Sequence, residues 1–70
     1  MNLRERVGLN LQRLRRNRDL SQEKLALLAD VDRGYVGKIE NAHYSVSVDM
    51  IEQLADALEV DPIEFFQPRD

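Results

Sequence analysis

The stretch LSQEKLALLADVDRGYVGKIEN, residues 20–41, contains two short apolar segments separated by a polar break. Ser21 and Asp32 stand at the start of these segments, and both residue types favour helix N-caps because their side-chain oxygens accept a bond from a free backbone N–H. We therefore expect one helix over about residues 21–29 and a second over about residues 32–41. Two short helices joined by a tight turn form a helix-turn-helix.

Residues inside this unit favour close packing of its two helices. Ala26 is small at the point where the helices are expected to cross, and Val31 is the apolar residue that such a turn buries. Gly34 and Gly37 are poor helix formers, so the second helix must be held by packing more than by propensity. The sequence thus places the helix-turn-helix at about residues 21–41.

Apolar spacing and capping residues predict three further helices. A helix over about residues 2–18 is indicated by apolar residues that recur at intervals of three or four, at Leu3, Val7, Leu11 and Leu14. Ser47 caps a fourth helix, and Asp61 followed by Pro62 begins a short fifth one. We expect a compact all-α domain of five helices over residues 1–70. Its predicted core comprises Val7, Leu11, Leu14, Leu25, Ala26, Val31, Val36, Ile39, Ile51, Leu54 and Leu58.

Composition narrows the classes of function. The chain has 70 residues, no cysteine and one histidine, which excludes disulfides and argues against an all-protein zinc site. No apolar run approaches the roughly 18 residues of a membrane span, and no apolar segment follows the charged N-terminus as in a secretory signal. We find no nucleophile–base pair, phosphate-binding loop or metal cluster. We therefore expect a cytoplasmic protein that is not an enzyme and needs no cofactor.

The charges are divided unevenly along the chain. Residues 1–38 carry nine Lys/Arg and five Asp/Glu, a net of +4, whereas residues 39–70 carry one and eight, a net of −7, which gives −3 in total. A negative total argues against a polyanionic partner, because nucleic-acid-binding domains are usually basic. The uneven distribution instead favours one face suited to phosphates and another turned away from them. Chance clustering on a solvated surface is the alternative.

Three motifs together resemble a known family. They are LSQEKLA at residues 20–26, DRGYVGKIEN at residues 32–41 and LADALEV at residues 54–60. In this order and spacing they resemble the lambda-repressor/Cro-like, or Xre-type, helix-turn-helix family over about residues 3–66. DRGYV and the SVS loop look most similar to the controller proteins of restriction–modification systems. The resemblance implies a lambda-repressor-like fold and a sequence-specific transcriptional regulator that binds double-stranded DNA.

The helix over residues 32–41 would enter the major groove and read bases. Arg33 in its first turn can bind the O6 and N7 atoms of guanine as a bidentate donor. Lys38 lies on the same face and could contact a base edge or a phosphate. Gly34 and Gly37 present no side chain and could only let the backbone approach the groove closely. Part of the specificity would therefore come from DNA shape.

Further DNA contacts are implied by the resemblance. Gln22 matches a position at which the family binds a phosphate at a helix N-terminus. His43, Tyr44 and Ser45 match a loop that contacts backbone phosphates. Tyr35 either packs its ring under the helix or faces DNA, and the resemblance favours the DNA-facing role.

Other positions concern the contacts that hold the DNA-reading helix and the loop after it in place. The resemblance implies an ion pair between Arg15 and Glu40, which would tie the first helix to the end of the DNA-reading helix. Gly8 either allows another helix to approach closely or weakens the first turns of its own helix. Ala42 stands where the family often has a glycine that relieves a left-handed turn, which predicts a different path for the following loop.

The chain is expected to act as a homodimer. A single recognition helix offers few base contacts, so two copies would present two such helices about 34 Å apart to an inverted-repeat operator. Ile63, Phe65 and Phe66 remain after the core is filled and predict a subunit interface, with Phe66 turned inward and Phe65 or Ile63 at the interface. No small-molecule ligand is evident. The alternatives are a protein-interaction module of the same fold and an antitoxin-like subunit that binds DNA and a partner protein.

Overall fold

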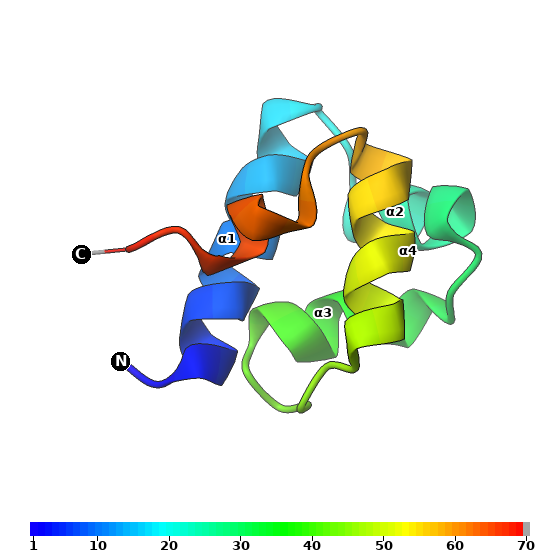
Figure 1. Cartoon of the computed structure of the whole chain (residues 1–70). Coiled ribbons are helices and arrows are strands. Elements are labelled where there is room, and N and C mark those ends of the chain that lie inside the picture. Colours follow the sequence, from blue (N-terminus) through cyan, green and yellow to red (C-terminus); the bar gives the residue numbers. More distant parts are fainter. Residues whose placement is uncertain (70) are drawn as a thin grey trace.

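A computed structural model describes residues 1–69 of the chain as four α-helices and one 3-10 helix (Figure 1). In chain order these are α1 (Leu3–Asn17), α2 (Gln22–Ala29), α3 (Arg33–Glu40), α4 (Val48–Leu58) and η1 (Pro62–Phe66). The all-α class is confirmed, but the expectation of five α-helices is wrong. In the fifth element Glu64 donates its backbone N–H to the carbonyl of Asp61, three residues earlier, at 2.9 Å. None of the helices in this part of the chain is both long and apolar enough to cross a membrane.

Capping side chains fix where each helix begins. The four predicted N-caps are confirmed, since each side chain accepts a bond at 2.9 or 3.0 Å from a backbone N–H of the first turn, at Ser21, Asp32, Ser47 and Asp61. α1 has a cap that the sequence analysis did not assign, in which the side chains of Asn2 and Glu5 each bond the other residue's backbone. These starting points determine which side chains of each helix face outward.

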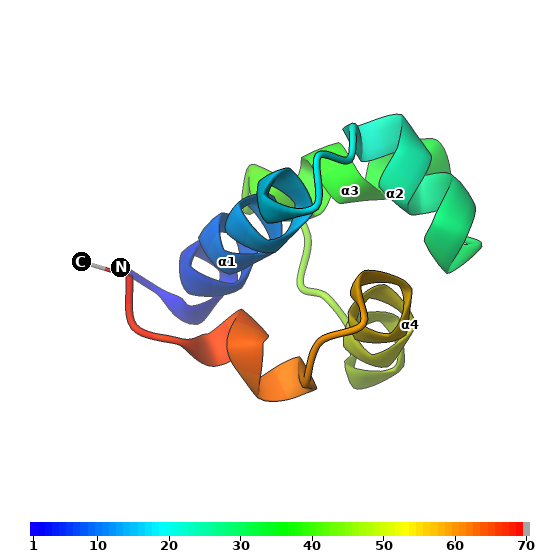
Figure 2. The same cartoon turned by 90° about the horizontal axis from the view of Figure 1, so that it is seen from above.

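The helices surround one apolar core. Figure 2 shows α2 and α3 lying together, with α4 and η1 across the core from them, and α1 packs against both α3 and η1. Every predicted core residue is buried except Val31, which is half-buried and packs against the cluster. Three buried members were not predicted, namely Ala29, Ala55 and Phe65.

Gly8 marks the point where α1 approaches α3 most closely. A Cβ atom at Gly8 would lie 2.5 Å from the carbonyl oxygen of Ile39 and 2.9 Å from that of Glu40. Only glycine fits there without a shift of the α3 backbone. Of the two sequence-based alternatives for Gly8, close approach of a helix is therefore the correct one. Leu3 departs from its predicted stripe, because the first turn of α1 reaches past the core and leaves Leu3 59% exposed.

Candidate nucleic-acid interface

α3 presents one face to the core and the other to solvent. Val36 and Ile39 are buried, whereas Arg33 and Lys38 are exposed. The guanidinium of Arg33 lies 3.8 Å from the carboxylate of Glu23, and its side chain is 79% exposed. Such an exposed pair restrains its partners little. Arg33, predicted to read a base, and Lys38, predicted to contact a base edge or a phosphate, therefore both lie on the outward face of α3.

Gln22, the first residue of α2, lies against α3. Its Nε2 donates a hydrogen bond to Oε1 of Glu40 at 3.1 Å. A Cβ atom at Gly37 would lie 3.2 Å from Oε1 of Gln22, so the missing side chain at Gly37 leaves room for this contact. Gly34, one turn earlier, is exposed. The two glycines thus differ, since Gly37 accommodates a neighbour and Gly34 leaves bare backbone on the outward face.

Arg15 and Glu40 form the ion pair that the resemblance implied. Nε and Nη2 of Arg15 donate to Oε2 and Oε1 of Glu40 at 2.6 and 3.0 Å, a bidentate arrangement. The bond to Glu40 raises the pKa of Arg15, while burial opposes the rise, so the guanidinium stays charged at physiological pH. Nη1 of Arg15 also donates to the carbonyl of Leu20 at 2.8 Å. Arg15 therefore connects α1 to the end of α3 and to the chain just before α2.

The loop after α3 begins with a left-handed turn. Ala42 has φ 60°, which is the conformation that favours glycine. The predicted different loop path is therefore wrong, because the alanine itself adopts the strained turn. The backbone N–H of Ala42 donates to Ile39 at 3.0 Å and that of His43 donates to Lys38 at 2.8 Å. His43 and Ser45 are left exposed to solvent.

Tyr44 brings the loop back to the outward face of α3. Its ring centroid lies 5.2 Å from that of Tyr35, with the planes inclined at 44°. Nζ of Lys38 lies 5.1 Å from the centroid of Tyr44 and 3.4 Å from its hydroxyl oxygen. Tyr35 thus packs against another aromatic ring instead of lying under its helix, and it stays 37% exposed.

The C-terminal aromatic residues are arranged in the reverse of the predicted order. Phe65 is fully buried, whereas Phe66 is 38% exposed and Ile63 is 61% exposed. The assignment of Phe65 to a subunit interface is therefore wrong, because its side chain is buried in the core of its own chain. Phe66 and Ile63 remain available at the surface.

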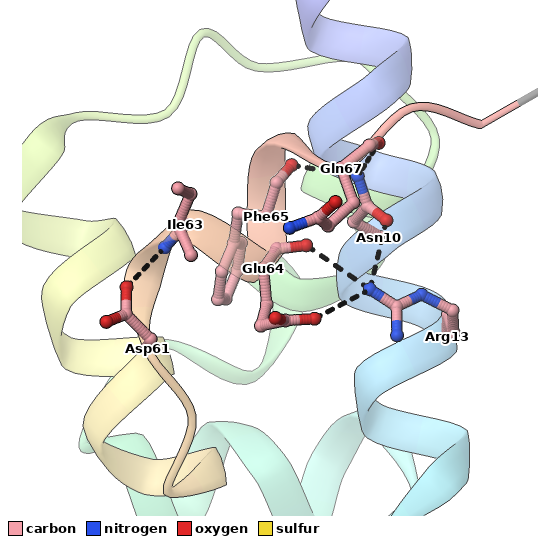
Figure 3. Close-up of polar contacts among 7 residues, drawn as sticks. All are labelled: Asn10, Arg13, Asp61, Ile63, Glu64, Phe65 and Gln67. Atoms are coloured by element: carbon pink, nitrogen blue, oxygen red, sulfur yellow. Dashed lines mark hydrogen bonds and ion pairs between the residues drawn. The ribbon is translucent and has the colours of Figure 1, made fainter.

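Asn10 on α1 fixes this arrangement (Figure 3). It is fully buried, and its Nδ2 donates to the carbonyls of Phe65 at 3.0 Å and Gln67 at 2.8 Å. Nη2 of Arg13 adds a bond to the carbonyl of Glu64 at 3.3 Å and an ion pair with its carboxylate at 3.5 Å. With the backbone of η1 held against α1, the side chain of Phe65 turns into the core. Sequence reasoning missed Asn10, although its place on the apolar stripe of α1 indicated that it is buried.

An apolar hollow of about 260 Å³ separates the start of α1 from the start of α4. Three exposed apolar side chains line it, Leu3, Val48 and Phe66. Tyr44 and Ser45 line it as well. The hollow therefore lies between Phe66 and the loop that follows α3.

Two short helices, the second with buried apolar residues on one face and exposed cations on the other, define a helix-turn-helix domain. The profile of the helix-turn-helix family matches residues 11–65 of the chain. The chain therefore belongs to the helix-turn-helix family, of Xre/Cro type, whose members are DNA-binding regulators of transcription and not enzymes.

Individual relatives are similar over nearly the whole chain. Control protein C.BamHI from Bacillus amyloliquefaciens is 39% identical over 62 residues, which is 87% of this chain and 76% of that protein. The uncharacterised HTH-type transcriptional regulator y4dJ from Sinorhizobium fredii is 33% identical over 70 residues, covering 100% of this chain and 91% of its own. The crystal structure of the restriction-modification controller protein C.AhdI from Aeromonas hydrophila is 43% identical, with a TM-score of 0.87 over 90% of this chain and 96% of that one. The similarity thus includes α1, α4 and η1 as well as the helix-turn-helix.

Proposed function

We propose that the chain binds an inverted-repeat operator as a homodimer, with α3 of each copy in the major groove, and that it controls a restriction–modification system. The observation that carries the DNA-binding part is the pair of exposed cations, Arg33 and Lys38, on a helix whose opposite face is buried. A guanidinium in the first turn of such a helix can bind guanine O6 and N7 together. The controller role is supported by the similarity to C.BamHI, C.MunI and C.AhdI.

Phosphate contacts accompany the base contacts in this proposal. Gln22 lies at the N-terminus of α2, where free backbone N–H groups favour an anion. His43 and Ser45 are exposed in the loop that follows α3. α4 and η1 lie across the core from α2 and α3 (Figure 2), so much of the acidic half of the sequence is turned away from the DNA. This arrangement reconciles a net charge of −3 with a polyanionic partner.

A second copy of the chain covers the apolar hollow in the proposed dimer. Leu3, Val48 and Phe66 supply its apolar surface, and Ile63 lies on the same 3-10 helix as Phe66. Because Tyr44 also lines the hollow, a partner seated there lies next to the DNA-facing loop.

Sedimentation at micromolar concentrations tests the dimer. Val48 is 82% exposed and begins α4, where an aspartate is favourable for the helix dipole. Val48→Asp should therefore leave the fold intact and shift the protein to a monomer. Leu27→Asp is the matched control, since Leu27 is 72% exposed on α2 and does not line the hollow. If both variants keep the wild-type mass, the proposed interface is wrong.

Selection of bound sequences from random duplex DNA at physiological salt tests the DNA-binding part. The wild-type protein should enrich an inverted repeat. Arg33→Ala should weaken binding by about 1–3 kcal/mol and relax the preference at one position of each half-site. Arg33→Lys keeps the charge without the planar pair of donors, so it should relax the same position. Lack of any enriched sequence at any salt concentration would favour a protein-interaction module instead.

A further inference from the structure

The two cations of the outward α3 face are held very differently. Arg33 is 79% exposed, and it approaches the exposed carboxylate of Glu23 at 3.8 Å. Nζ of Lys38 lies 5.1 Å from the ring centroid of Tyr44 and 3.4 Å from its hydroxyl oxygen. From this difference we propose that Tyr44 is a positioning residue, which holds Lys38 in the orientation that binds DNA. This inference rests on the proposed function and assigns a specific task to Tyr44 within it.

The contact between Lys38 and Tyr44 is supported on both sides. A cation within about 6 Å of an aromatic centroid is attracted by the negative face of the ring. The ring of Tyr44 is itself braced by Tyr35, at 5.2 Å between centroids. The loop is tied to α3 at the preceding residue, because the N–H of His43 donates to the carbonyl of Lys38 at 2.8 Å. Backbone and side chain of Lys38 are thus both joined to the segment that carries Tyr44.

Holding Lys38 in place has a consequence for binding. A free lysine must lose rotamer freedom when it contacts DNA, and this loss weakens affinity by about two- to twelvefold for one long side chain. A lysine already restrained by an aromatic ring loses less. Its ammonium has three donors, so a bond to the Tyr44 hydroxyl leaves two for a base edge or a phosphate. Gly34 and Gly37 contribute no side chain on this helix. DNA affinity should therefore depend more strongly on the orientation of Lys38.

A double-mutant cycle on DNA affinity tests whether Tyr44 acts through Lys38. Tyr44→Leu should weaken binding to the selected operator about fivefold, and Tyr44→Phe, which keeps the ring, by less than about twofold. In the Lys38→Ala background, Tyr44→Leu should have almost no further effect. Lys24, the other lysine of the chain, provides the control, because the losses for Lys24→Ala and Tyr44→Leu should multiply.

Proton NMR of the free protein provides a readout that does not depend on DNA. The terminal methylene protons of Lys38 should be shifted upfield by the ring of Tyr44, and the shift should persist in Tyr44→Phe and vanish in Tyr44→Leu. An unshifted Lys38 in the wild-type protein overturns the inference. Wild-type binding with multiplicative losses for Lys38→Ala and Tyr44→Leu overturns it too, because Tyr44 would then contact DNA directly. Failure of the wild-type protein to bind any duplex overturns the proposed function and this inference with it.

Discussion

Asn10 and Arg15 lie on the same helix, five residues apart, and both are buried polar side chains. Arg15 binds Glu40 at the end of α3 and so fixes the proposed DNA-facing side. Asn10 binds the backbone of η1 and so fixes the side that carries Phe66 and the apolar hollow. α1 thus serves as a frame between the two surfaces that an operator-binding dimer needs.

The two contacts differ in what remains when one partner is lost. The side chain of Glu40 is 1% exposed, and a buried carboxylate without its cation is strongly destabilising. The carbonyl groups bonded by Asn10 are neutral, and leaving such a group unpaired costs about 1–3 kcal/mol. Loss of Arg15, on the DNA-facing side, should therefore lower the free energy of unfolding more than loss of Asn10, on the opposite side.

The largest effect is expected from Arg15→Met, which leaves Glu40 buried and unpaired and should lower the free energy of unfolding by about 3 kcal/mol. Glu40→Met should cost less, because Arg15 keeps its hydrogen bond to the carbonyl of Leu20. The double variant should cost no more than Arg15→Met alone, since it removes both charges. Urea denaturation of the four proteins measures the coupling. Additive losses would show that the two residues act independently.

An exposed ion pair provides the control for this cycle. Arg18 and Glu59 approach to 2.8 Å, but their side chains are 43% and 74% exposed. Glu59→Gln should change the free energy of unfolding by less than about 0.5 kcal/mol. A loss as large as that of Glu40→Met would show that burial is not the reason for the effect at Arg15.

On the other side of the frame, Asn10→Ala should lower the free energy of unfolding by about 2 kcal/mol, because two carbonyls lose their donor. Asn17→Ala, at an exposed position of the same helix, is the matched control and should change it by less than about 0.5 kcal/mol. Urea denaturation compares the two variants. Equal losses would mean that η1 is held by the burial of Phe65 and not by Asn10.

The sequence allowed the ion pair to be predicted but not the contact made by Asn10. The helices and most of the core follow from local signals, namely apolar spacing and capping residues. Arg15 and Glu40 could be paired because both match motif positions of a known family. The partners of Asn10 are backbone carbonyls 55 and 57 residues away, and a backbone carbonyl has no side-chain signature in a sequence.

The short helix η1 and the loop after α3 show a second limit of prediction. η1 has five residues, too few for a periodic pattern to tell Phe65 from Phe66. The contact of Lys38 with Tyr44 depends on the path of the connecting loop. That path follows from the positive φ at Ala42, a conformation that the residue type disfavours. Where a short element or a strained turn decides the geometry, tertiary contacts override the local signal.

A smaller effect is expected where α1 meets α3 next to the ion pair. Gly8→Ala gains about 1 kcal/mol of helix propensity, but its Cβ would lie 2.5 Å from the Ile39 carbonyl, and such overpacking costs about 1–3 kcal/mol. A net loss of about 1 kcal/mol should appear in urea denaturation. Gly34→Ala is the contrasting variant and should not show this loss of stability, because its Cβ would meet only the Asp32 side chain, at 3.2 Å. If both variants are stabilised, the close helix approach does not constrain Gly8.

The smallest effect is expected at Ala42, in the left-handed turn just after Glu40. Ala42 has φ 60°, where an alanine is strained by about 1 kcal/mol relative to its preferred backbone. Glycine removes this strain but gives the unfolded chain more freedom, so Ala42→Gly should raise the free energy of unfolding by about 0.5 kcal/mol. Asn41→Gly is the control, because Asn41 has φ −91° and glycine there should only destabilise. A loss of stability in Ala42→Gly would mean that the left-handed turn is not the conformation of this loop in solution.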